Sequence, residues 1–198
     1  MKSAKLLLSV SVLLGGILLS QCAPKRDFVD KELLVDVSIM PETWDLLRAV
    51  IVDDHDEGEE SSARITFYKT NTAYLVRGGE TVYRFRSTSR AGRQYWRMES
   101  RYYGVSPRHI TTWEMPNGFT FSSLSANQWR FVCSDTTFSP TPEFGEVSTV
   151  CVYPAQYAEF VVFSPITTKV NDEMMIEIKD VQHFVEAIDQ KMVQHLDP

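Results

Sequence analysis

The sequence lacks the residue patterns of several common functions. It has only three cysteines and four histidines, and no two histidines share metal-ligand spacing with a carboxylate or thiolate. It contains no G-x-S-x-G elbow, no phosphate-binding glycine loop and no H-E-x-x-H pair. The formal net charge is −6, whereas general nucleic-acid binding needs a basic surface that replaces counterions. We therefore expect no metal, no cofactor, no nucleic-acid partner and no catalytic activity.

Long apolar runs are also scarce, and the one that exists lies near the first residue. Residues 6–19 are fourteen uncharged positions preceded by two lysines, which is the layout of a signal peptide. A transmembrane helix needs roughly 20 apolar residues, so a permanent span is the weaker alternative. We expect a signal peptide over residues 1–21.

The first cysteine follows this run directly. Leu19 stands three places before Cys22, which resembles the lipobox of bacterial lipoproteins, in which the cysteine thiol receives a diacylglycerol. Gln21 is bulkier than the small residue usual at that place. The expectation is lipidation of Cys22 and a cell-membrane location on the extracytoplasmic side, with residues 22–32 as a tether and 33–198 as one folded domain. The alternative is a soluble secreted protein with a leftover thiol.

The other two cysteines, Cys133 and Cys151, each lie in a β-type run, and a loop rich in Ser, Thr, Pro and Gly separates them. Exported proteins meet an oxidising environment in which such a pair normally closes. Closing the 19-residue loop would contribute about 3 kcal/mol. A redox-active pair would usually have Cys-x-x-Cys spacing, so we expect a structural disulfide.

Two segments have helical periodicity. Residues 90–102 repeat apolar side chains at helical spacing, with Ser89 as the expected N-cap. Residues 178–196 place apolar side chains on one face and polar ones on the other. The other segments are mainly strand-like. This order of elements indicates an α+β single domain whose antiparallel sheet is covered on one face by a central and a C-terminal helix.

The strand-like segments leave some alternatives open. Residues 33–39 fit a first strand or a buried lead-in, and residues 42–52 fit a helix or a strand. Gly78 and Gly79 predict a tight hairpin turn, since glycine supplies the positive φ that such a turn needs. Further β-type segments are residues 63–69, 119–124, 128–133, 148–153 and 158–164.

An arginine series on the central helix is the main candidate for binding. At 100° per residue its members fall within about 80° of one another on the helix barrel. One interpretation is an exposed face with local salt bridges, for example to the acidic loop at residues 53–60. The other is a contact surface for anionic lipid headgroups or an acidic partner. The series consists of Arg90, Arg93, Arg97 and Arg101, with Arg84 and Arg86 beside it.

The acidic loop itself fails as a calcium site. When Gly58 is set at the sixth place of an EF-hand loop, Asp53 is first and Arg64 is twelfth, where a bidentate glutamate should be. A cation at that place would repel the metal, so we expect a solvated loop. The four tryptophans and the other aromatic residues are expected mostly in the core.

The C-terminal third resembles a group of uncharacterised exported bacterial lipoproteins of the kind found in Chloroflexus-like bacteria. Those proteins are similar in having a leader ending in cysteine, a cysteine pair around an A-Q-Y-E-E-like strand and a closing A-I-D-E-x-M helix, here residues 155–159 and 187–192. Ala158 replaces the first acidic residue of that strand. The resemblance implies an exported lipoprotein and brings no activity, cofactor or substrate.

The expected function is therefore non-catalytic binding or scaffolding at the envelope, with the arginine series as the contact surface. A small-ligand-binding protein is the alternative, and it would need an aromatic-lined pocket. An envelope hydrolase would need a nucleophile, a base and an orienting acid within about 3 Å of one another in series.

Overall fold

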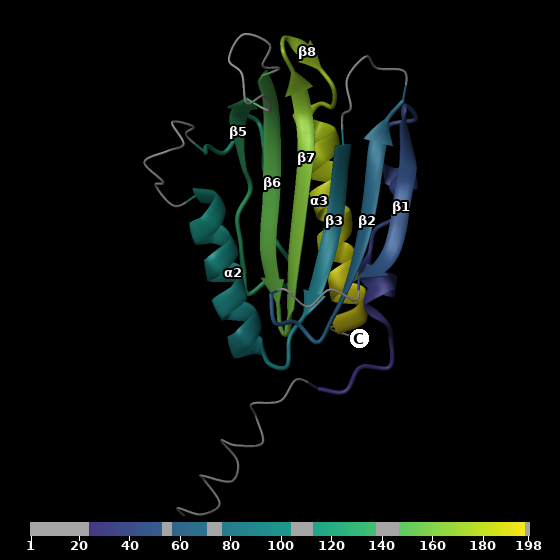
Figure 1. The fold of residues 1–198 in the computed structure, drawn as a ribbon, viewed down its shortest axis with the longest axis vertical. Coiled ribbons are helices and arrows are strands. Elements are labelled where there is room, and N and C mark those ends of the chain that lie inside the picture. Colours follow the sequence, from purple (N-terminus) through teal and green to yellow (C-terminus); the bar gives the residue numbers. More distant parts are fainter. Residues whose placement is uncertain (1–23, 53–56, 71–76, 104–112, 138–146, 197–198) are drawn as a thin grey trace, which may run out of the picture.

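The computed structural model describes residues 24–52, 57–70, 77–103, 113–137 and 147–196. These residues form one α+β domain with an antiparallel sheet of eight strands, in the order β1-β2-β3-β7-β6-β4, with β5 pairing with β6 and β8 with β7 (Figure 1). The strands are β1 (Trp44–Val52), β2 (Ser61–Lys69), β3 (Arg77–Arg84), β4 (Gln128–Trp129), β5 (Val132–Thr137), β6 (Val147–Tyr157), β7 (Phe160–Val170) and β8 (Glu173–Met174). The helices are η1 (Asp30–Leu33), η2 (Val37–Ile39), α2 (Thr88–Tyr103) and α3 (Ile178–Leu196).

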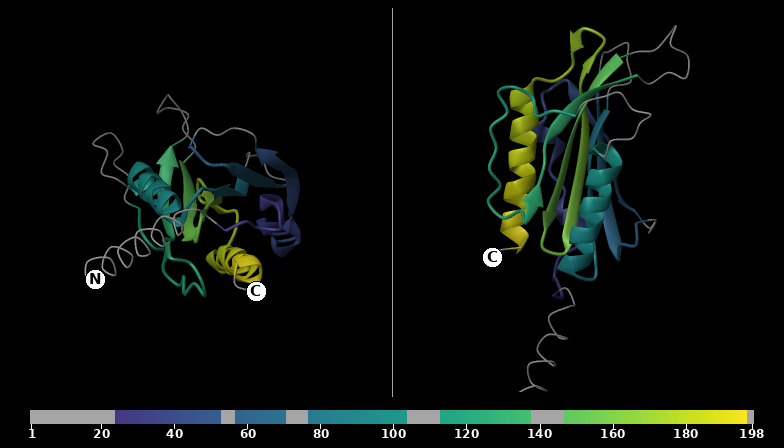
Figure 2. Two further views of the ribbon diagram at one scale, coloured as in Figure 1. Left: turned by 90° about the horizontal axis from the view of Figure 1, so that it is seen from below. Right: turned by 90° about the vertical axis from the view of Figure 1, so that its left-hand side faces the viewer.

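The two α-helices lie on opposite faces of the sheet (Figure 2). Successive strand residues point to opposite faces, so Phe160 joins the large core beneath α3 while its neighbour Val161 joins a smaller cluster beneath α2. The predicted α+β domain, with an antiparallel sheet covered by a central and a C-terminal helix, is confirmed, whereas the expectation that the helices cover only one face was wrong. Both faces carry apolar residues, and each helix covers one of them.

Helix α3 has the bounds that its apolar pattern predicted. Its buried side chains recur at intervals of three and four residues, which places them on one face of a helix. Phe184 also meets the ring of Phe67 from β2, with centroids 5.3 Å apart. The apolar face consists of Val181, Phe184, Val185, Ile188 and Met192.

The segment before β1 is a buried lead-in with two short 3₁₀ helices rather than a strand. Leu33, Leu34 and Val35 are buried in the core beneath α3. Contacts with the domain begin before residue 33, because Arg26 pairs with Glu159 in the turn between β6 and β7. Part of the segment expected as a tether therefore packs against the sheet.

Gly78 and Gly79 lie inside β3, where they pair with Phe67 and Thr66 of β2, so the predicted turn at these glycines was wrong. A Cβ at Gly78 would collide with the Phe67 ring and would come within 2.7 Å of Ile166. A Cβ at Gly79 would lie 2.7 Å from a backbone oxygen. These glycines allow close packing across the sheet, which is the other common use of glycine in a strand.

Two further strand predictions have clear outcomes. Residues 44–52, left undecided between helix and strand, form the edge strand β1. Residues 119–124 lie in an irregular segment instead of the predicted strand. In the described part of the chain, neither α-helix has the length and hydropathy of a membrane-spanning segment.

Candidate functional site

Helix α2 is fixed at its start by a side-chain cap. The hydroxyl oxygen of Ser87 accepts a hydrogen bond from the Arg90 backbone N–H at 3.3 Å, and the helix begins at Thr88. Ser87 is therefore the N-cap, two residues before the Ser89 that was expected. The cap satisfies one of the free N–H groups of the first turn.

The inner face of α2 holds it against the sheet. Ala91, Tyr95 and Met98 are buried in the cluster that includes Val161. Gln94 is also buried, and its amide donates a hydrogen bond to Glu57 Oε2 at 2.7 Å. The helix is thus tied both to the sheet and to the end of the acidic loop, which leaves its opposite side free to face outward.

Three of the predicted arginines, Arg90, Arg93 and Arg97, are exposed on α2. Arg93 and Arg97 line a shallow hollow together with Trp96 and Ser100. We call Arg90, Arg93, Trp96, Arg97 and Ser100 the α2 surface. The fourth predicted arginine belongs to the last turn of α2, but the side chain of Arg101 lies outside the described residues.

Local salt bridges form beside the α2 surface. Arg86 pairs with Glu60 at 3.1 Å, as expected for an arginine near the acidic loop. Arg130 Nη1 contacts Glu99 Oε1 of α2 at 2.9 Å. Within the ranges that the structure describes, no ion pair involves the three exposed arginines of the α2 surface.

The α2 surface combines two kinds of recognition chemistry. Guanidinium groups donate forked hydrogen bonds to carboxylate or phosphate oxygens and stay charged at any physiological pH. The Trp96 side chain lines the same hollow and is 56% exposed, and indole supplies apolar contact area with one N–H donor. Such a surface is suited to an anionic group that is attached to an apolar or aromatic neighbour.

Trp96 is the residue that the sequence interpretation missed, because tryptophans were expected mostly in the core. The spacing of the apolar residues along the helix indicates that Trp96 faces outward. With Ala91, Tyr95 and Met98 defining the buried face, Trp96 falls about 130° from the middle of that face at 100° per residue. A tryptophan so far from the apolar face of its own helix is an outward-facing residue.

A second hollow lies on the other side of the sheet, where the irregular segment 113–127 runs over the α3 side (Figure 2). Three of its six lining residues are aromatic, and Phe121 meets Trp129 edge to face with centroids 4.9 Å apart. Polar groups are present at its rim. The hollow is lined by Met115, Phe119, Thr120, Phe121, Ser122 and Trp129.

A buried polar network fixes that segment to α3. Asp189 accepts hydrogen bonds from the Ser123 hydroxyl, from the Leu124 N–H at 2.7 Å and from the Tyr157 hydroxyl at 2.9 Å. The Tyr157 hydroxyl also lies 2.8 Å from that of Tyr153, and burial raises the pKa of both tyrosines. Every contact of the carboxylate serves to position backbone or side chains, so this network is structural.

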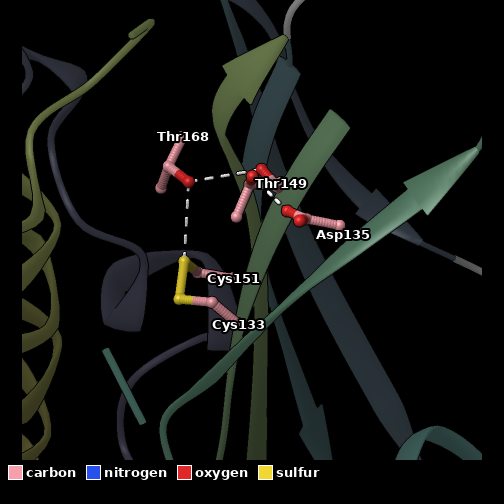
Figure 3. The surroundings of a disulfide bond; sticks show 5 residues. All are labelled: Cys133, Asp135, Thr149, Cys151 and Thr168. Atoms are coloured by element: carbon pink, nitrogen blue, oxygen red, sulfur yellow. Dashed lines mark hydrogen bonds between the residues drawn. A yellow bond between two sulfur atoms is a disulfide. The ribbon is translucent and has the colours of Figure 1, made fainter. Parts of the chain in front are cut away.

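The predicted disulfide joins Cys133 and Cys151, which are paired directly across β5 and β6 (Figure 3). The backbone N–H and C=O of Cys133 both bond to Glu114 on its other side, so the cysteine pair is a non-hydrogen-bonded one, in which side chains are closest. Thr168 lies 3.7 Å from the Cys151 sulfur. A disulfide is typical of proteins that fold in an oxidising compartment.

The structure describes the other predicted site residues only in part. Cys22 and residues 53–56 lie outside the described residues. Of the rest of the acidic loop, Glu59 is buried and Glu60 is exposed. The described ranges contain no cluster of three metal-ligating side chains.

Comparison with known proteins yields one structural likeness. No family model matches the chain, and no curated protein matches its sequence. The crystal structure of the extracellular domain of PknH from Mycobacterium tuberculosis is similar with a TM-score of 0.49 and 9% sequence identity, over 85% of this chain and 98% of that chain. The resemblance to exported bacterial lipoproteins stays a prediction.

Proposed function

We propose that this protein is a lipid-anchored, extracytoplasmic binding protein without catalytic activity, held by Cys22 and binding anionic groups through the α2 surface. The observation that carries the proposal is the hollow lined by Arg93, Trp96 and Arg97, in which the tryptophan is exposed and neither arginine forms an ion pair with a carboxylate of the described residues. Exposed guanidinium groups with no internal partner retain their charge for an external one.

The proposed location is supported by two features of different kinds. The sequence from residue 6 to Cys22 has the order of a lipoprotein leader. The disulfide between Cys133 and Cys151 is of the kind that forms outside the cytoplasm. Intact mass of the mature protein tests both at once, because acyl groups add mass at the new first residue and disulfide formation removes two hydrogen atoms.

Binding is tested with the folded domain carrying Cys22→Ser and no leader. We expect it to sediment with vesicles of phosphatidylglycerol or to bind a polyglutamate peptide, and the binding should weaken as salt screens the charges. Arg93→Glu with Arg97→Glu should abolish the binding. The matched control is Arg48→Glu with Arg77→Glu, which changes the net charge equally at exposed positions away from α2. Binding to neither probe, or equal loss in both variants, would contradict the proposal.

The second candidate function is small-ligand binding in the hollow beside Trp129. The observation in its favour is the lining of three aromatic rings and a methionine with hydroxyl groups at the rim, which is the usual composition of a small-molecule site. Titration with an apolar aromatic compound, followed by the NMR signal of the Trp129 indole, should shift that signal in the unmodified protein and not in Phe121→Ser. An unchanged indole signal in the unmodified protein removes this candidate.

A further inference from the structure

Strand β1 leaves one edge of the sheet open. It is the first strand in the sheet order, and of the strands that the structure describes only β2 pairs with it (Figure 1). At the other end of the sheet, Glu114 forms a β-bridge with Cys133 and so occupies part of the β5 edge. An unpaired edge strand presents a row of backbone N–H and C=O groups that can pair with another chain.

The open strand exposes two leucines between two opposite charges. Leu46 and Leu47 are 49% and 50% exposed, and the exposed side chains of Asp45 and Arg48 flank them. No ion pair involves Asp45 or Arg48 within the part of the chain that the structure describes. Natural edge strands usually carry lysine, proline or a bulge against pairing with other chains. Of these protections β1 has only a bulge.

The bulge at Leu47 decides which side chains share a face of the sheet. Asp45 is paired with Tyr68 of β2 and Arg48 with Thr66, so Leu47 is an extra residue. Residues three apart in a regular strand point to opposite faces, whereas Tyr68 and Thr66 are two apart and share a face. Asp45 and Arg48 therefore lie on the same face. The extra residue disturbs pairing with a regular strand, but a partner strand with the same bulge can match it.

We propose that β1 pairs with β1 of a second copy of this chain, antiparallel and about a two-fold axis between Leu46 and Leu47. In this register the two bulges face each other, and Leu46 of each copy lies opposite Leu47 of the other. Asp45 of each copy lies opposite Arg48 of the other, on the same face of the joined sheet. Opposite charges directly across an antiparallel ladder are stabilising. The strand is thus complementary in charge to its own antiparallel copy, which favours a second copy over an unrelated strand.

The two-fold axis stands perpendicular to the joined sheet, so the dimer carries both α3 helices on one face and both α2 helices on the other. Helix α2 packs on β6 and β7, and β2 and β3 separate these strands from β1. The pairing of β1 therefore does not rest on the proposed function of the α2 surface. Binding of a peptide to that surface is counted per domain, so it does not depend on whether β1 is paired.

Sedimentation velocity of the folded domain with Cys22→Ser and no leader tests the pairing. A contact of this length is at the small end of specific interfaces, so we expect a reversible dimer with a dissociation constant in the micromolar range. Asp45→Arg leaves only cations at the two charged positions and Arg48→Asp leaves only anions, so each variant alone should bind itself about tenfold more weakly. An equal mixture of the two should restore the dimer, because each copy supplies the charge that the other lacks. Glu173→Arg makes the same charge change as Asp45→Arg at an exposed position of β8 and should leave association unchanged.

A second measurement determines the register. Asp45→Cys mixed with Arg48→Cys, both with Cys22→Ser, should form a mixed disulfide on mild oxidation, because residues directly opposite have Cβ atoms about 5 Å apart. Asp45→Cys alone should not, since its two copies are offset along the strands by about 7 Å in addition to the strand spacing. The inference is overturned by a monomer at every concentration, by a dimer insensitive to both charge variants, by a mixture that stays monomeric, or by absence of the mixed disulfide.

Discussion

Substitution of Glu80 by glutamine should remove a fall in stability with rising pH. Glu80 is fully buried in β3, and its Oε2 accepts a hydrogen bond from the Val35 N–H at 2.9 Å. Its other oxygen has no hydrogen-bond partner among the described residues. Burial in this apolar setting is the main cause that raises the pKa of the carboxyl from 4.5 to about 8, against the opposing influence of the Val35 N–H and of Lys191.

The direction of this pH effect follows from whether the folded or the unfolded protein holds the proton on Glu80. Between pH 4.5 and about 8 the folded protein keeps a proton on Glu80 that the unfolded chain releases. Unfolding then releases a proton, and the free energy of unfolding decreases as pH rises through this window. At 1.36 kcal/mol per tenfold change in acidity, the decrease between pH 5 and pH 9 amounts to about 4 kcal/mol. That is a large share of the 5–15 kcal/mol typical of a whole domain.

Urea unfolding of the unmodified protein and of Glu80→Gln at pH 5, 7 and 9 checks this. The glutamine oxygen can still accept from the Val35 N–H, so the two proteins should be close in stability at pH 5. The variant should be more stable by about 4 kcal/mol at pH 9. Glu173→Gln is the matched control, because that side chain is exposed, and it should leave the pH profile unchanged. Parallel profiles for the unmodified protein and Glu80→Gln would refute the reasoning.

Three further predictions concern stability. Arg26→Ala should cost about 3 kcal/mol in chemical unfolding because it leaves the Glu159 carboxylate buried and unpaired, and adding Glu159→Gln should recover most of the loss. Replacing Cys133 and Cys151 by alanine should cost about 3 kcal/mol and make the thermal midpoint insensitive to reductant; a midpoint that still falls with reductant would contradict this. Gly78→Ala should cost about 2 kcal/mol through overpacking in the core, measured by urea unfolding, and an unchanged midpoint would show that the sheet relaxes around the new methyl group.

Local patterns predicted the elements whose packing agrees with their own periodicity. Helix α3 is recognisable because its apolar side chains all meet one core, and a buried amphipathic stripe reports that contact directly. The cysteine pair is recognisable because β5 and β6 are consecutive strands that pair with each other, so the two residues need no distant information to meet. The arginine series is predicted for the same reason, since its members share one helix.

Long-range packing decided the features that were missed. Gly78 and Gly79 have the composition of a turn, but their role depends on Phe67 and Ile166 in two other strands. The segment 119–124 has strand-like residues, yet it is held by Asp189 through backbone and hydroxyl hydrogen bonds instead of a neighbouring strand. The distribution of α2 and α3 over opposite faces likewise depends on how the strands pair, and no single segment encodes it.

The packing of the N-terminal segment and of α2 on opposite faces follows from the alternation of a single strand. Phe160 and Val161 are neighbours in β7, yet one receives Phe28 from the N-terminal segment and the other packs beneath α2. Because the side-chain period of a strand is two, adjacent residues necessarily serve opposite faces. A slip of one residue would turn Phe160 toward α2 and Val161 toward α3, so neither face would receive the side chain that now packs on it. The pairing of β3 with β7 therefore decides which side chains of β7 meet the N-terminal segment and which meet α2.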